Sequence, residues 1–244
     1  HDVLRYDEGY PKDSAQYRAQ KRLLELSVHV TACSNYLARC VQNTFGCKKV
    51  HTVYNGVDLA RFSTPKSSPN TLRNAPYLFA WGRLEQIKGF DLLIKAFAGC
   101  KAAHELRLLI AGDGTQRENL LRMIEKYGLK DKAVLVGRLT PDEIVQYAQN
   151  SKINIIPSLR ESFGIVALEA IAAKRPMIAT NGGGLPEVIS EKYGLIVPTD
   201  ADEIRFAIDW ILQGERTFDF SDAAEYLDRF TIPNMVEKYI SLVK

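Results

Sequence analysis

Residues 152–174, KINIIPSLRESFGIVALEAIAAK, decide how this chain folds. The first five residues are a short apolar stretch, the Pro-Ser pair after them ends it, and an apolar run begins again at Gly164. This pattern predicts a buried strand over 152–156, a loop, and a helix over 164–174. One glutamate, Glu161, stands in the loop, and a second, Glu169, stands inside the helix.

The same alternation continues on both sides of this stretch. Strand-like runs occupy 77–81, 106–111, 133–136, 152–156, 176–179 and 194–197. Helical stretches occupy 89–98, 115–127, 141–149, 164–174, 184–190 and 201–213, and two more helices are expected at 221–229 and 233–243. Short, continuous apolar strands that alternate with helices are typical of a parallel sheet covered on both faces. The sequence therefore predicts an α/β fold with a Rossmann-like, doubly wound parallel sheet.

The region before residue 63 is less regular. We expect a helix over 13–27, a β-rich stretch over 28–33, a helix that follows the N-cap Ser34, and a strand over 50–54. Residues 63–74 are rich in Ser, Pro, Asn and Thr, which favours a linker. The chain opens on His1-Asp2-Val3 with no methionine, so we expect a truncated protein.

The composition excludes several classes of protein. The net charge of +3 over 244 residues is too balanced for a protein that binds nucleic acid through its phosphates. The sequence has no run of 18 apolar residues, as a membrane span would need, and no signal peptide at its visible start. The four cysteines form no C-x-x-C pair and lack a histidine cluster, so zinc is not expected. Plain thiols in a reducing cytoplasm fit best.

Ligands of such a sheet bind beyond the carboxyl ends of its strands, so the loops there are the candidate sites. The first strand is followed by Gly82, which allows a tight turn, and by the cations Arg83 and Lys88. An R-x4-K pair taken alone is more often two solvated cations. Its position at the end of a strand favours a diphosphate site, because guanidinium and ammonium groups both bind phosphate oxygens.

Two further loops are less specific. The stretch A-G-D-G-T at 111–115 has no third glycine of a dinucleotide fingerprint, so a structural turn is favoured there. In V-G-R-L-T-P at 136–141, the backbone around Gly137 could bind a base or could be a short connection, and the residues favour neither.

The helix that begins near Gly164 offers an anion site of its own. The first N–H groups of a helix are unpaired, and its dipole adds partial positive charge, so the tip could hold a diphosphate. Glu169 lies about 1.4 turns inside and could reach a sugar ring, and Glu161 could face the group on the far phosphate. Capping or solvated carboxylates are equally good readings of both acids. The glycines of N-G-G-G-L-P-E at 181–187 repeat the arrangement, and Glu187 could either offset the helix dipole or contact a ligand.

Taken together, these motifs resemble a known family. The set N-G-V-D at 55–58, G-R-L-x3-K-G at 82–89, G-D-G at 112–114, E-S-F-G-x4-E-A at 161–170 and G-G-x-P-E at 183–187 is similar to the retaining family 4 glycosyltransferases of the GT-B fold. The resemblance covers nearly the whole chain. It implies a hexosyltransferase that moves a sugar from a nucleotide-diphosphate donor, UDP- or GDP-linked, with retention of anomeric configuration and without a metal or other cofactor.

The resemblance also implies roles for individual residues. Arg83 and Lys88 would bind the diphosphate, Glu169 the ribose and Glu161 the transferred sugar. The rest of the implied donor site consists of Gly82, Gly137, Arg138, Leu139 and the backbone of Phe163, Gly164, Ile165 and Val166. The implied catalytic set is Arg83, Lys88, Glu161 and, at the edge of the acceptor side, His1.

By the same resemblance we divide the chain into three parts. Residues 1–54 would be the end of an N-terminal acceptor-side domain, 55–230 the donor-binding domain, and 231–244 a helix that packs back on the first domain. The rest of that first domain, or a partner chain, would complete the enzyme, so we expect this chain to bind the donor and transfer little sugar. The acceptor would be a carbohydrate or a lipid-linked molecule of polysaccharide biosynthesis. The expected location is the cytoplasm or the inner face of the membrane.

Three alternatives compete with this interpretation, and the residues argue against the dehydrogenase. A nucleotide-sugar epimerase of the same fold would need acid-base residues in the missing half. A nicotinamide dehydrogenase would need G-x-G-x-x-G after the first strand, where the sequence has W-G-R-L-E-Q. A non-catalytic module that binds carbohydrate or nucleotide sugar would not need all of the cations and acids that the motifs contain.

Overall fold

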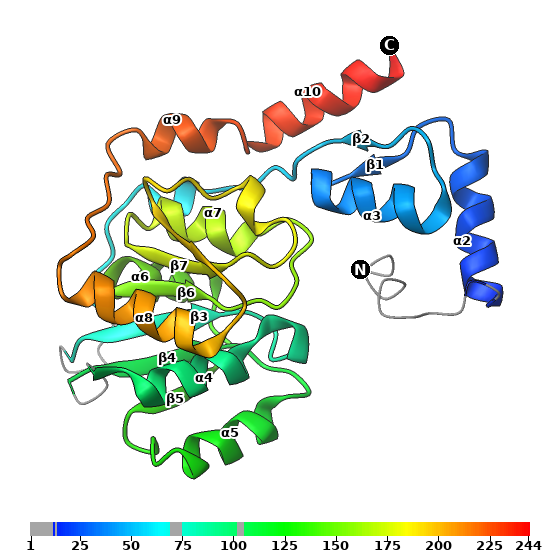
Figure 1. Ribbon diagram of the computed structural model, residues 1–244. Coiled ribbons are helices and arrows are strands. Elements are labelled where there is room, and N and C mark those ends of the chain that lie inside the picture. Colours follow the sequence, from blue (N-terminus) through cyan, green and yellow to red (C-terminus); the bar gives the residue numbers. More distant parts are fainter. Residues whose placement is uncertain (1–11, 13, 69–74, 102–104) are drawn as a thin grey trace. The chain divides into compact units, whose positions relative to one another are not determined.

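Six of the apolar stretches form one parallel sheet, in a computed structural model that describes residue 12 and residues 14–68, 75–101 and 105–244. The described chain divides into two compact units, one of residues Asp58–Leu227 and one of the residues up to Val57 together with Asp228–Lys244. The sheet belongs to the first unit (Figure 1). Its strands are β3 (Tyr77–Trp81), β4 (Arg107–Ala111), β5 (Ala133–Gly137), β6 (Ile153–Ile156), β7 (Met177–Thr180) and β8 (Gly194–Val197).

The strand order is β5-β4-β3-β6-β7-β8, and every neighbouring pair is parallel. The predicted Rossmann-like, doubly wound fold is thereby confirmed. The strands over 77–81 and 194–197 have the predicted bounds, and the other four are displaced by one residue at one or both ends.

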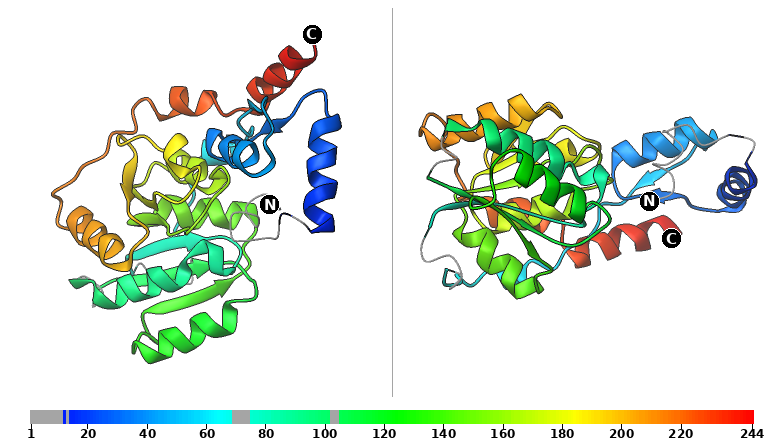
Figure 2. Two further views of the ribbon diagram at one scale, coloured as in Figure 1. Left: turned by 45° about the vertical axis from the view of Figure 1, so that its right-hand side comes forward. Right: turned by 90° about the horizontal axis from the view of Figure 1, so that it is seen from below.

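Helices cover both faces of the sheet (Figure 2). On one face, side chains of β3, β4, β6 and β7 share a buried cluster with three helices. The opposite face packs against two other helices, which contact β3, β6 and β7. The first group comprises α4 (Phe90–Gly99), α5 (Arg117–Lys126) and α8 (Ala201–Leu212), and the second comprises α6 (Pro141–Asn150) and α7 (Ile165–Ala172). The core is therefore two apolar layers separated by the sheet, and strands buried on both faces explain the continuous apolar runs in the sequence.

Local sequence fixes the start of several helices. Thr140 and Glu143 form a reciprocal capping box at α6, with Pro141 in the first turn. The side chain of Asp200 accepts from two backbone N–H groups at the start of α8. Such caps satisfy donors that the helix itself leaves unpaired.

One predicted helix is wrong. Residues 184–190 form only a 3₁₀ turn, η5 (Leu185–Glu187). The N–H of Val188 donates to the carbonyl of Leu185, three residues back, and both side chains are fully buried. Three residues per turn place these two side chains on the same side, toward the core.

The second unit is smaller and has its own apolar contacts. It contains two parallel two-residue strands. The rings of Tyr17 and Phe45, which come from two different helices of this unit, stack with their centroids 5.0 Å apart. The strands predicted over 28–33 and 50–54 are thus much shorter than expected. A Cβ on Gly56 would lie 2.5 Å from the Cα of Ile232, so the chain needs glycine at this close approach. The elements are α2 (Ala15–Leu26), β1 (Thr31–Ala32), α3 (Asn35–Phe45), β2 (His51–Thr52) and α10 (Ile232–Val243).

The remaining short elements are η1 (Ala60–Phe62), η3 (Gln86–Lys88) and α9 (Ala223–Asp228). All four cysteines are free thiols, and Cys40 and Cys100 are buried, as the sequence predicts for plain thiols. Within the described ranges, no helix has the length and apolar character that crossing a membrane requires.

Candidate donor-binding site

The centre of the sheet brings the predicted site residues to one edge. Strands β3 and β6 are neighbours, and the chain order reverses between them, because β4 and β5 lie on one side and β7 and β8 on the other. Ligands of open parallel sheets bind outside the carboxyl ends of the strands at such a reversal. The loops that follow these two strands, 82–89 and 157–164, carry the predicted diphosphate-binding groups.

Lys88 and Glu161, one from each loop, are in direct contact. The ammonium of Lys88 donates a hydrogen bond to Oε2 of Glu161, and the two side chains form a partly buried ion pair. The loops are also joined through their backbones, since the N–H of Leu159 donates to the carbonyl of Ile87 at 2.9 Å. An ammonium has three donors, so Lys88 can hold a carboxylate and a phosphate oxygen at the same time.

Arg83 directly follows Gly82 at the carboxyl end of β3. Its side chain is exposed and lines a hollow of about 250 Å³ beyond the ends of β3, β4 and β5. The predicted residues Gly82, Arg138 and Leu139 line the same hollow, together with Trp81, Ala111, Gly112, Asp113 and Ile144. Lys88 is not one of the described residues around it. The structure thus places Arg83 beside the predicted base-binding loop, and Lys88 beside Glu161.

The start of α7 is suited to an anion. Gly164 is its N-cap residue, with a left-handed φ of 111°, and no described side chain caps the first turn. Phe163 is only 2% exposed while Ile165 is 42% exposed, so the tip is anchored in the core and still reaches water. Unpaired first-turn N–H groups together with the helix dipole attract negative charge.

Glu169 is held by a residue that the sequence analysis did not single out. Oε2 of Glu169 accepts a hydrogen bond from Nε1 of Trp81 at 2.9 Å. Burial raises the pKa of the Glu169 carboxyl above its ordinary value, while this hydrogen bond and the charge of Arg61 act in the opposite direction. The signal that could have revealed Trp81 is its place at the last position of β3, because a buried indole N–H needs an acceptor.

The glycines at 182–184 approach the chain's own backbone. A Cβ on Gly183 would lie 2.2 Å from the carbonyl oxygen of Glu161, and one on Gly182 would lie 2.4 Å from that of Ser158. The N–H of Gly184 donates to the carbonyl of Glu161 at 2.7 Å. These glycines therefore fix the loop that carries Glu161. Likewise Gly112 packs against the backbone of Gly82, which agrees with the structural turn predicted at G-D-G.

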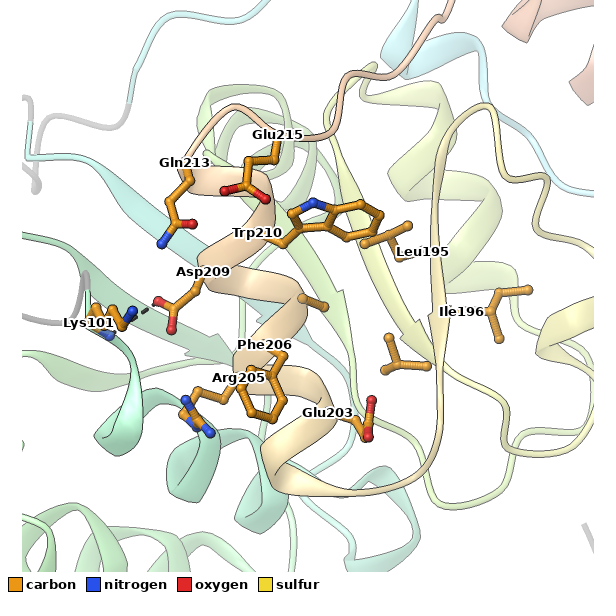
Figure 3. Close-up of a pocket in the computed structure, with 12 residues that line it drawn as sticks. Lys101, Leu195, Ile196, Glu203, Arg205, Phe206, Asp209, Trp210, Gln213 and Glu215 are labelled. Carbon is orange, nitrogen blue, oxygen red and sulfur yellow. Dashed lines mark hydrogen bonds between the residues drawn. The ribbon is translucent and has the colours of Figure 1, made fainter.

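A larger hollow of about 470 Å³ lies on α8 and β8 (Figure 3). Its wall includes the exposed aromatic side chains of Phe206 and Trp210, and Asp209 points toward Lys101. The carboxylate of Asp209 accepts from the backbone N–H of Lys101 at 3.2 Å and is only 8% exposed. Among the described residues that line this hollow, none belongs to the predicted donor site. The predicted donor-binding residues lie at the carboxyl ends of the strands and do not line this larger hollow.

Two sequence families match the chain. Residues 64–227 match the family described as Glycosyl transferases group 1, and residues 1–61 match Glycosyltransferase Family 4. An uncharacterized glycosyltransferase of Methanocaldococcus jannaschii is 28% identical over 252 residues, which cover 96% of this chain and 65% of that protein.

Solved glycosyltransferase structures share the fold. Sucrose-phosphate synthase from Thermosynechococcus elongatus superposes with a TM-score of 0.83 at 23% identity, over 99% of this chain and 64% of its own. The Anabaena protein HepE in complex with UDP and glucose has a TM-score of 0.81 at 23% identity, over 96% and 68%. This chain therefore spans about two thirds of the length of these proteins.

Proposed function

Since this chain belongs to the group 1 glycosyltransferases and has the Rossmann-like fold of GT-B enzymes, we propose that it binds a nucleotide-diphosphate sugar. This molecule would be the donor of the sugar that the enzyme transfers. The observation that carries the proposal is the convergence at the carboxyl ends of β3 and β6. There, the Lys88–Glu161 pair, the start of α7 and Glu169 come from two loops and one helix. Cations, a helix tip and carboxylates are the groups that phosphates and sugar hydroxyls require.

In this proposal each group of residues binds one part of the donor. Arg83, Lys88 and the backbone N–H groups at 163–166 bind the diphosphate, Glu169 accepts from the ribose hydroxyls, and Glu161 accepts from the transferred sugar. The loop Gly137-Arg138-Leu139 meets the base, because Arg138 and Leu139 line the hollow beside Arg83. His1, the proposed group on the acceptor side, lies outside the described residues.

The proposed reaction retains the anomeric configuration. The bond between the anomeric carbon and the diphosphate oxygen breaks, and the acceptor oxygen bonds to that carbon on the same face. The acceptor's hydroxyl proton passes to the departing phosphate oxygen. Negative charge grows on the nucleoside diphosphate during this step, and prearranged cations and helix N–H groups stabilise it most in a site that is dry. The proposal assigns this neutralisation to side chains and backbone, with no metal ion and no cofactor.

UDP is the first nucleotide to test, because the neighbour HepE was solved with UDP, and GDP and ADP follow. The acceptor we propose is a carbohydrate or a lipid-linked molecule. Isothermal titration of the folded chain with the three nucleotides should give heat of binding with at least one, with or without EDTA. Absence of heat with all three would overturn the proposal.

Single substitutions then test the site. We expect Lys88→Met to weaken nucleotide binding by about 1.5–3 kcal/mol, the usual loss for a hydrogen bond to a charged group. Lys130→Met is the matched control, because Lys130 is also paired with a glutamate but is 67% exposed at its side chain and lies outside the site. Equal affinities of the two variants would remove Lys88 from the diphosphate site.

A further inference from the structure

We propose that Trp81 is a positioning residue for the donor, whose indole N–H holds the Glu169 carboxylate in the orientation that accepts hydrogen bonds from the nucleotide's ribose. This inference rests on the proposed function and adds a residue to it. Trp81 and Glu169 are 88 positions apart, and the bond between Nε1 and Oε2 joins the last residue of β3 to the middle of α7.

The indole ring is itself held in place. Its plane stacks on the ring of Phe79 with centroids 5.0 Å apart and an angle of 18° between the planes, and Phe79 in turn stacks on Tyr147 at 5.4 Å. Trp81 is only 6% exposed and Phe79 is fully buried. A ring fixed by this stack presents its N–H in one direction, so the bond to Glu169 constrains the carboxylate and leaves the indole unmoved.

The bond to Trp81 leaves the Glu169 carboxylate with further acceptor sites for hydrogen bonds. An ionised carboxylate has about four acceptor sites, and the indole N–H occupies one of them. The remaining capacity suits a vicinal diol, which offers two hydroxyl donors. Without the indole, the carboxylate could rotate about its terminal torsion, which is broad for glutamate, and fewer of its conformations would face a ribose.

Trp81 also connects two parts of the site. Besides binding Glu169, it lines the hollow that Arg83, Arg138 and Leu139 share. The charged group that acts on Glu169 from a neighbouring element is Arg61 in η1. The indole therefore borders the proposed base site and holds the proposed ribose acceptor.

A double-mutant cycle on nucleotide affinity tests the proposal. Trp81→Phe removes the N–H and keeps a ring for the stack, and Glu169→Met removes the acceptor. We expect Trp81→Phe to raise the Kd of the tightest-binding nucleotide about tenfold, the effect of one hydrogen bond to a charged group. In the Glu169→Met background, the same change should have almost no effect. Equal effects of Trp81→Phe in both backgrounds would overturn the proposal.

The pH dependence gives a second readout. The indole bond favours the ionised carboxylate, so its loss should matter more as the pH falls from neutral toward the raised pKa of the Glu169 carboxyl. The Kd ratio of Trp81→Phe to wild type should therefore rise over this range, and titration of the nucleotide's own phosphate cancels in that ratio. A ratio that stays constant contradicts the assigned role.

A control separates positioning from general damage to the core. Leu78→Ala damages the core on the opposite face of β3 and leaves the indole and its stack in place, so it should lower thermal stability and change the Kd much less than Trp81→Phe does. If Leu78→Ala weakens binding as much, the indole bond has no special role. A wild-type chain that binds none of the three nucleotides defeats the proposed function itself, whereas normal binding by Trp81→Phe at every pH defeats only this inference.

Discussion

Asp209, on helix α8, is buried and Glu169, at the carboxyl edge of the sheet, is half-buried, and their carboxylates have different partners. Asp209 accepts from the backbone N–H of Lys101, a donor that is present whatever the neighbouring side chains are. Glu169 accepts from the indole of Trp81, a donor that depends on one residue type. A backbone partner fixes the path of the chain, whereas a side-chain partner orients the carboxylate itself. The difference separates an acid that supports the fold from one that is available to a ligand.

The largest difference between the two regions should be the loss of unfolding free energy when one glycine in each is replaced by alanine. Gly183, against the Glu161 loop, and Gly214, just after α8, both have a φ of 76°. An alanine Cβ at 183 would lie 2.2 Å from a backbone oxygen, while no described atom lies within 4 Å of one at 214. Gly214→Ala should cost about 1–2 kcal/mol of unfolding free energy, the penalty of a left-handed alanine alone.

Gly183→Ala carries the same conformational penalty and must also displace the Glu161 loop. We expect a total loss of about 3 kcal/mol or more, together with weaker nucleotide binding. Urea unfolding and nucleotide titration of both variants measure these effects. Equal losses of stability would show that the tight approach at Gly183 is not needed.

Effects of intermediate size are expected when each of the two acids is replaced by alanine. Asp209→Ala leaves the Lys101 N–H without its acceptor, so we expect a loss of about 1–3 kcal/mol in unfolding free energy and no change in nucleotide affinity. Glu169→Ala should instead weaken nucleotide binding by about 1–3 kcal/mol. Denaturant unfolding and calorimetry of both variants provide the measurements. Nucleotide binding that responds to Asp209→Ala and ignores Glu169→Ala would reverse the assignment of the two acids.

The smallest effect should appear in the pH dependence of stability. Because burial raises the pKa of Glu169 in the folded state, the folded protein holds its proton to higher pH than the unfolded chain does. Stability from this group is therefore greatest below the ordinary pKa of 4.5 and falls as the pH rises through the window between that value and the raised one. Thermal unfolding across this window should show a shallower decline for Glu169→Gln than for wild type. The same decline in both would contradict the raised pKa.

Much of the fold follows from local sequence. The strand over 194–197 and the helix α6 could be predicted nearly to the residue, because an apolar run between breakers and a capping box at Thr140 act over a few neighbouring positions. The turn at Leu185–Glu187 was wrongly predicted as a longer helix. Burial of its side chains against other parts of the chain fixes this turn, and the local sequence does not show that burial.

For the candidate site, the sequence pointed to the residue types and their edge of the sheet. Arg83, Lys88 and Glu161 stand in loops after predicted strands, so their approach to the strand ends was expected. Glu169 was expected inside the helix that follows one of these loops. The sequence could not show that Lys88 is paired with Glu161, or that Arg83 and Arg138 line the same hollow.

The sequence alone determined the alternation of strands and helices, the motifs that carry the family resemblance and the loops that carry charge, since each element, motif or loop is a short local stretch of the chain. Only the tertiary structure decided which of those charges meet. The pairs Lys88–Glu161 and Trp81–Glu169 are 73 and 88 positions apart, and they form because β3 and β6 lie side by side at the reversal of strand order. Strand order is set by how the apolar layers pack over the whole sheet, so no local pattern specifies the partner of a side chain at its edge.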